Sequence, residues 1–167
     1  MLNRTKLTTP QELFLHDLGA CLTMEETVDG MLETLVDEAR DQELKQTLRH
    51  HREETQAQIR NLRRAFDAIG EEAETKPCPA IEGIEKEGEA NLKMTDESLH
   101  DDVILAGCAE TEHHEIAVYE NLIVHAGSLG HEDVVALLTE NLEQEQHTLG
   151  EVLKATLKTA QSSGAAA

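Results

Sequence analysis

Acidic residues interrupt otherwise apolar helical stripes at several places along this chain. Between Leu18 and Ala39, the residues spaced three or four apart are apolar apart from Glu25. Glu112 interrupts a second stripe in the same way, and Glu145 interrupts a third. Because residues at this spacing share one face of a helix, each carboxylate is predicted to point into a hydrophobic core.

A fourth stripe carries an imidazole, His51, with Glu54 one turn later on its edge, and Glu115 lies beside the seam that contains Glu112. An unpaired carboxylate in a core costs several kcal/mol, and a bound cation would satisfy all of these groups together. Carboxylates with a minority of imidazole suit iron or manganese, and inward Glu residues with a Glu/His pair three apart are typical of di-metal bundles. The predicted ligands are Glu25, His51, Glu54, Glu112, Glu115 and Glu145.

We expect this set to hold two metal ions. Iron is the expected metal, and manganese and zinc are the alternatives. Tyr119, two turns after Glu112, is interpreted as a core tyrosine with a hydrogen-bonded hydroxyl, with a role beside the metal as the alternative. His113 is a candidate donor to its neighbour Glu112, whereas His147 falls on the polar side of its helix.

The elements that must position these residues are long helices. Thr9-Pro10-Gln11-Glu12 combines an N-cap, a proline at the first helical position and a capping-box glutamate. Pro77 and Pro79 disfavour a helix between the second and third long helical segments. The predicted helices are 9–40, 42–69, a short and marginal one over 80–92, 96–126 and 131–159, with a frayed tail over 160–167.

Helices of this length cannot bury their apolar stripes alone, so they must form a bundle. The short breaks after the first and third long helices predict antiparallel hairpins, and the connection of roughly 26 residues between the hairpins can cross the bundle lengthwise. The predicted fold class is all-α, a ferritin-like four-helix bundle whose long crossover carries a short extra helix, as a single domain over 1–167.

Composition excludes several function classes. The chain has 167 residues with a formal charge of -20 and only 2% aromatic residues, so DNA binding by a basic patch and base stacking on aromatics are disfavoured. No apolar run approaches the roughly 18 residues that span a bilayer, and the start lacks a secretory signal. We therefore expect a cytoplasmic protein that binds neither nucleic acid nor membrane.

Four segments of the chain, in this order, resemble the YciE/YciF-type ferritin-like stress proteins. They are ELFLHDL at 12–18, HREETQAQ at 51–58, KPCPAIEGIEKEGE at 76–89 and ETEHHEIAVYENL at 110–122. The resemblance covers about residues 7–158. It implies a ferritin-like bundle with an added crossover helix, commonly dimeric, with a di-metal site built from the same six residues.

The sequence departs from the wider ferritin-like pattern at two ligand positions. The pair on the second helix is His before Glu, and Thr148 stands where a ligand histidine would follow Glu145. His114 also replaces the family's tyrosine. These departures weaken the inference of ferroxidase or peroxidase chemistry from better-known relatives and leave metal binding itself unaffected.

Three functions remain open from the sequence. The first is a di-iron or di-manganese protein that oxidises Fe(II) or reduces peroxide, with oxygen or peroxide as the small oxidant. The second is a non-enzymatic stress or scaffold protein, a homodimer whose metal stabilises the bundle. The third is a metal-free bundle dimer in which the buried acids pair with arginines.

Overall fold

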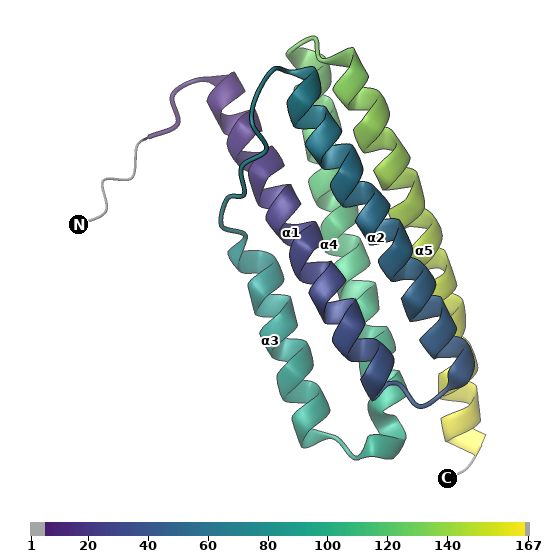
Figure 1. Cartoon of the computed structure of the whole chain (residues 1–167). Coiled ribbons are helices and arrows are strands. Elements are labelled where there is room, and N and C mark those ends of the chain that lie inside the picture. Colours follow the sequence, from purple (N-terminus) through teal and green to yellow (C-terminus); the bar gives the residue numbers. More distant parts are fainter. Residues whose placement is uncertain (1–5, 166–167) are drawn as a thin grey trace.

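The computed structural model describes residues 6–165, which form helices and connecting turns without any strand. The long helices are α1 (Pro10–Glu38), α2 (Gln42–Ala68), α4 (His100–Ser128) and α5 (Glu132–Ala165). Helix α3 (Pro79–Met94) and the 3-10 turn η1 (Glu97–Leu99) lie in the crossover. Figure 1 shows α1–α2 and α4–α5 as two antiparallel hairpins side by side, with α3 along the outside. The predicted four-helix bundle with a long crossover is confirmed.

The start of α1 is fixed by the capping box that the sequence predicts. The backbone N–H of Glu12 donates to Thr9 Oγ1 at 3.1 Å, and the N–H of Thr9 donates to Glu12 Oε2 at 3.1 Å. Gly70 and Gly130 follow α2 and α4 with φ of 76° and 78°, a left-handed conformation that suits glycine and ends each helix.

Several helix ends differ from the expectation. Helix α4 begins at His100 rather than 96, because Glu97–Leu99 form the 3-10 turn η1. The crossover helix lies where it was expected but is longer, spanning Pro79–Met94 rather than 80–92. Pro79 occupies its first turn, and Ile81 is fully buried. A side chain at Gly83 or Gly88 would meet open space, so close packing does not require glycine at either position. The tail predicted to fray over 160–167 is helical through Ala165 because α5 continues its i to i−4 ladder; residues 166–167 lie outside the described part.

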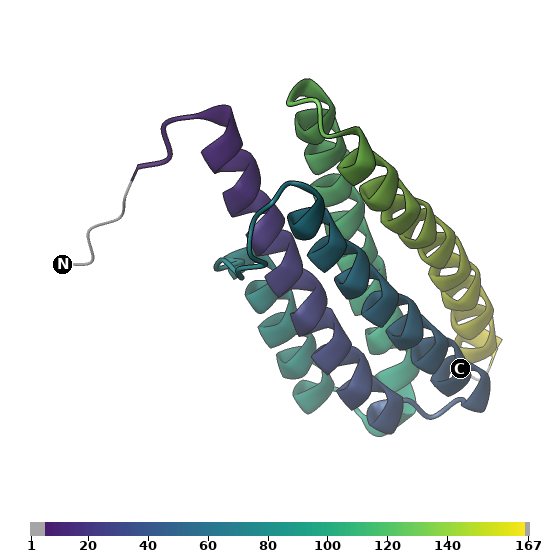
Figure 2. The same ribbon diagram turned by 45° about the horizontal axis from the view of Figure 1, so that its top comes forward.

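The crossover is tied to α1 at a glycine. The backbone N–H of Lys76 donates to the Gly19 carbonyl at 3.0 Å, and Thr23 Oγ1 donates to the Lys76 carbonyl at 2.6 Å. A Cβ at Gly19 would lie 2.5 Å from the Glu74 carbonyl oxygen, so only glycine allows this approach. Figure 2 shows the crossover reaching α3, which packs on α1 and α4.

The core lies along the axis of the bundle and is aliphatic, with Phe14, Phe66 and Tyr119 as its aromatic members. Its centre is polar, because the buried acids of three helices meet there. Among residues 6–165, none of the helices combines the length and apolar character that a membrane span requires.

Candidate metal centre

Four predicted ligands converge in the middle of the bundle. His51 comes from α2, Glu112 and Glu115 from α4, and Glu145 from α5, and each offers a ligand atom within 4.8 Å of the others. The three carboxylates are fully buried and His51 is 4% exposed. His51 Nε2 lies 3.1 Å from Glu112 Oε1. We call these four residues the core cluster.

Local helix geometry explains the convergence. Glu112 and Glu115 are three residues apart on α4, so both side chains leave the same face of that helix. Helix α5 packs on both α4 and α2, which brings Glu145 and His51 to the same place. The sequence predicted the position of each residue along the bundle axis, and the packing of neighbouring helices sets the distances between these side chains.

Glu25 reaches the centre from α1 and is fully buried beside the core cluster. Burial, and then the charge of Glu145, raises the pKa of Glu25 well above its usual value. One of its oxygens, Oε1, accepts a hydrogen bond from the Tyr119 hydroxyl, while Oε2 has no hydrogen-bond partner among the residues that the structure describes. Glu25 therefore has one oxygen held in place and one left free to bind.

Glu54, the sixth predicted ligand, lies at the margin. Its side chain is 21% exposed, and its Oε1 is 3.6 Å from Nε2 of the exposed His50. Its charge still acts on the centre, because it contributes, after burial and other causes, to the raised pKa values of Glu112 and Glu145. The structure does not include Glu54 in the core cluster, since the outward edge of α2 keeps its carboxylate near solvent.

The electrostatics of the centre favour a cation. Burial raises the pKa values of Glu112, Glu115 and Glu145, and the charge of Glu145 reinforces the rise at Glu112 and Glu115. Burial lowers the pKa of His51 to about 4, so its imidazole is neutral and can donate a lone pair. Within residues 6–165, neither carboxylate oxygen of Glu112, Glu115 or Glu145 has a hydrogen-bond partner. A positive charge would stabilise all three carboxylates as anions.

Arginine does not provide that charge, contrary to the third function that the sequence left open. Arg52 pairs with Asp29 and Glu33, and Arg63 pairs with Glu26, all at the outer face. In the described part of the chain, no lysine or arginine forms an ion pair with Glu25 or the core cluster. The donor set of oxygens and one imidazole nitrogen fits iron, manganese or zinc.

A hydrogen-bonded chain behind Glu25 was missed by the sequence reasoning. Tyr119 donates to Glu25, and Asn141 Nδ2 lies 3.0 Å from the Tyr119 hydroxyl. Asn61 Nδ2 donates to Asn141 Oδ1 at 2.9 Å, and Arg64 donates to Asn61 Oδ1 at 3.0 Å. The signal was present in the sequence, because Asn141 precedes Glu145 by one helical turn, but an asparagine beside a stripe does not reveal its partner.

The Tyr119 expectation is met, since the tyrosine is buried and its hydroxyl is bonded. The expected role of His113 is wrong: its side chain is exposed, because it leaves α4 on the face opposite the core. His147 is exposed as expected, and His114 is half-buried. Gln58 of α2 is a further missed residue. It is 1% exposed, and neither the oxygen nor the nitrogen of its side-chain amide has a hydrogen-bond partner in residues 6–165.

Comparison with known proteins places the chain in a family. Residues 9–164 match the family described as a domain of unknown function, DUF892. YcfI of Rhodopseudomonas palustris, described as a candidate structural protein, is 34% identical with a TM-score of 0.86, covering 91% of this chain and 97% of its own. No curated protein shows significant similarity.

Two further solved structures are similar. The Escherichia coli stress protein YciF is 25% identical with a TM-score of 0.88, covering 93% of this chain and 99% of its own. A Xanthomonas campestris protein, 22% identical with a TM-score of 0.74 over 92% and 95% of the two chains, shares the fold. The family match and these full-length similarities show that the chain belongs to the DUF892 family of YciF-type proteins.

Proposed function

We propose that this protein is a ferritin-like di-metal protein of the stress response, which binds two iron or manganese ions and uses them to oxidise Fe(II) or to reduce peroxide in the cytoplasm. One observation carries the proposal. Six carboxylate oxygens of Glu112, Glu115 and Glu145 are buried around the neutral imidazole of His51, and none has a hydrogen-bond partner in the described part of the chain. Isolated acids in a core destabilise the folded state, and a bound metal would stabilise all of these carboxylates together.

The residues of this chain would share the binding as follows. Glu112, Glu115 and Glu145 would supply oxygens, His51 would supply a nitrogen, and Glu25 would add its free Oε2. Bound iron or manganese supplies the redox chemistry, which no side chain of the cluster can supply. Tyr119 and Asn141 hold the Glu25 carboxylate in one orientation, as the partners of metal ligands commonly do.

Glu54 has a separate task in this proposal. Its carboxylate is 21% exposed and lies 3.6 Å from the exposed His50, and its charge acts on Glu112 and Glu145. The chain as a whole carries a charge of -20. A hydrated cation is attracted by such a field and needs a polar path into the bundle. Glu54 would thus accept the ion at the surface and pass it to the buried carboxylates.

A role in stress is proposed because YciF, a full-length structural match, is a stress protein. We also propose a homodimer, on the resemblance to dimeric family members and on Leu153 and Leu157. These residues lie one turn apart on α5 and are 50% and 61% exposed. Light scattering coupled to gel filtration tests the dimer, and a monomeric mass at micromolar concentration would contradict it.

Metal content of untagged protein, measured by plasma mass spectrometry, is the first test. Anaerobic titration with Fe(II) follows, and then exposure to dioxygen or peroxide with absorbance recorded. We expect about two ions per chain and repeated turnover. A matched pair of variants provides the control: Glu112→Gln with Glu115→Gln removes two cluster acids, and Glu110→Gln with Glu120→Gln removes two exposed acids from the same helix.

Each result of this test favours one function. Turnover in the wild type and the surface variant, but not in the cluster variant, supports redox chemistry at this centre. Two bound ions without turnover favour the alternative, a non-enzymatic scaffold with a structural metal. A folded protein that binds none of Fe(II), Mn(II) and Zn(II) would contradict both metal-based functions.

A further inference from the structure

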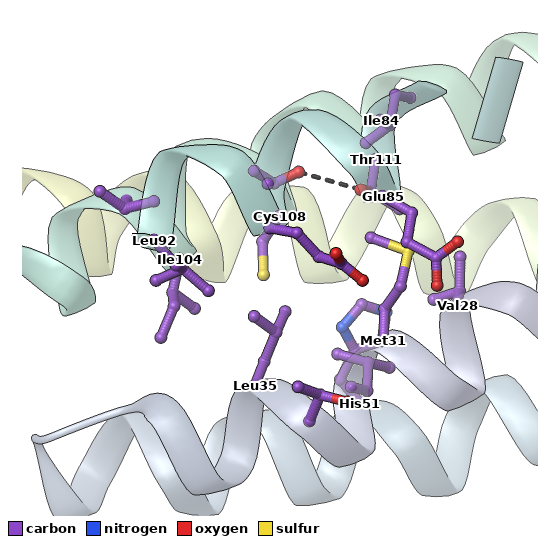
Figure 3. Close-up of a pocket in the computed structure, with 16 residues that line it drawn as sticks. Val28, Met31, Leu35, His51, Ile84, Glu85, Leu92, Ile104, Cys108 and Thr111 are labelled. Atoms are coloured by element: carbon purple, nitrogen blue, oxygen red, sulfur yellow. Dashed lines mark hydrogen bonds between the residues drawn. The ribbon is translucent and has the colours of Figure 1, made fainter. Parts of the chain in front are cut away.

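The crossover helix covers an apolar pocket that ends at a residue of the core cluster. The pocket lies between α1, α3 and α4, has a volume of about 80 Å³, and His51 of α2 forms part of its wall. Its apolar lining includes Val28, Leu32, Ile84, Leu92 and Ile104. Figure 3 shows the His51 ring and the Cys108 thiol facing the space between these helices.

Burial along the lining gives the pocket a direction. Thr34 and Glu89 at one side are exposed, whereas Ile104 and His51 are 2% and 4% exposed. The pocket therefore leads from the surface beside α3 to the imidazole of the core cluster. It is separate from the polar edge at Glu54, which does not line it.

Two polar groups of the inner wall, on Thr111 and Cys108, offer little to a polar guest, whereas His51 Nε2 at the inner end has no hydrogen-bond partner among the described residues. Thr111 Oγ1 already donates to the Gly107 carbonyl at 2.9 Å, the bond drawn as a dashed line in Figure 3. Burial raises the pKa of the Cys108 thiol to about 12, so the thiol is neutral. A hydroxylic molecule or a hydrated ion would give up most of its hydrogen bonds along the apolar wall before it reached His51, whereas a small apolar molecule would give up none.

The size of the pocket selects among apolar guests. An apolar cavity of about 150 Å³ can hold benzene or xenon, so a pocket of roughly half that volume suits a diatomic gas or a single xenon atom. Two glycines keep it open. Gly88 of α3 and Gly107 of α4 line the pocket, and a Cβ at either would meet nothing within 4 Å.

We propose that this pocket is a binding site for dioxygen and its access route to the centre beside His51. The proposal rests on the proposed redox function and deepens it, since it names dioxygen rather than peroxide as the molecule that this pocket admits. Cations and peroxide, which need hydrogen-bonding partners, reach the centre by the polar edge at Glu54. The crossover helix α3 then has a functional role, because it forms one wall of the route.

Xenon binding to metal-free protein tests the pocket without any turnover. Xenon is apolar and of suitable size. It can be located by diffraction from crystals pressurised with xenon, and its binding in solution can be followed by ¹²⁹Xe chemical shifts. Gly107→Leu is expected to fill the pocket and abolish xenon binding. Gly83→Leu is the matched control, because Gly83 is an exposed helical glycine of α3 that does not line the pocket.

The second measurement compares oxidants in iron-loaded protein. Filling an apolar site with extra carbon atoms changes a rate by about tenfold or more, so Gly107→Leu should slow oxidation by dioxygen by at least that factor. Oxidation by peroxide should be unchanged, as should both rates in Gly83→Leu. Circular dichroism shows whether Gly107→Leu is folded, and its iron content shows whether it is loaded with metal. Gly88→Leu is a second variant that fills the pocket, from α3 instead of α4.

The outcomes separate this inference from the proposed function. Xenon beside His51 that is lost in Gly107→Leu, together with selective slowing of dioxygen, supports the route. If xenon does not enter the pocket, or if oxidation by dioxygen is unaffected in both Gly107→Leu and Gly88→Leu, the proposed route is wrong. The proposed redox function would not be contradicted by that result. If the loaded wild type reacts with peroxide but not dioxygen, the dioxygen assignment is wrong even though metal chemistry is present.

Discussion

The Tyr119 hydroxyl donates a hydrogen bond to Oε1 of Glu25, and this contact joins α4 to α1 in the core of the bundle. Both side chains are fully buried. The same hydroxyl lies 3.0 Å from the amide nitrogen of Asn141, so a residue of α5 is drawn into the contact as well. Three helices are thus held in register at the height where the core cluster lies.

Replacing the tyrosine tests this contact. Tyr119→Phe keeps the ring but leaves one oxygen of Glu25 without a partner and removes one acceptor of the Asn141 amide, which keeps its contact with the Gln58 carbonyl at 3.3 Å. The lost contact costs about 1–3 kcal/mol of unfolding free energy. Metal affinity should fall by about 10–100-fold, the usual effect of losing a partner of a ligand. Urea unfolding and metal titration measure the two effects. A double-mutant cycle with Glu25→Leu, which cannot accept the hydrogen bond, isolates the pair, and a coupling energy near zero would contradict the contact.

Neutralising a cluster acid should separate metal binding from folding. Glu145→Gln is close to isosteric with the protonated acid, so the metal-free variant should be at least as stable as the metal-free wild type at pH 7.5. It should lose most of the metal-induced rise in melting temperature, which binding to the native state produces. Glu140→Gln, at an exposed position of the same helix, should retain that rise. An equal rise in both variants would remove Glu145 from the site.

The stability of the metal-free protein should fall as pH rises above neutrality. Burial raises the pKa of Glu112 from 4.5 to about 11, and those of Glu25 and Glu115 also rise, so the folded state holds protons that the unfolded state has released. The loss is about 1.4 kcal/mol per pH unit for each such proton. His51, whose pKa falls to about 4, acts in the opposite direction only below about pH 6.5.

Urea unfolding at pH 7 and pH 9.5 measures this dependence. Glu112→Gln should flatten the slope, because one of the retained protons is gone. Metal-loaded protein should also show a flatter slope, since its carboxylates are already deprotonated, and should instead release metal as pH falls. A metal-free wild type that gains stability between pH 7 and 9.5 would show that these acids are not held protonated.

Two glycines of α1 should respond to alanine with opposite signs. Gly19→Ala places a Cβ 2.5 Å from the Glu74 carbonyl oxygen and 2.7 Å from Lys76 Cγ, so the crossover must shift. We expect a loss of about 1–3 kcal/mol despite the better helix propensity of alanine. Gly30→Ala meets nothing within 4 Å and should gain up to about 1 kcal/mol. Chemical denaturation of both variants measures the contrast, and equal effects would contradict the close approach.

Much of the bundle could be predicted from local patterns. The capping box at Thr9 and Glu12 and the breaks near Gly70 and Gly130 are short-range signals, and the structure reproduces each of them. The crossover helix was underestimated because helix propensity counts Gly83 and Gly88 as penalties. Propensity does not register that Ile81 is buried against the bundle, and this tertiary burial outweighs it.

The sequence by itself determined which residues could form the centre, because a three-to-four spacing fixes the face of a helix on which Glu25, His51, Glu112, Glu115 and Glu145 lie. Only the tertiary structure decided how close they come. It left Glu54 at the solvent edge, connected Tyr119 to Glu25 and opened the pocket beside His51. Periodicity is a property of one helix, whereas these relationships depend on the separation and rotation of neighbouring helices, which are set by the packing of every side chain between them.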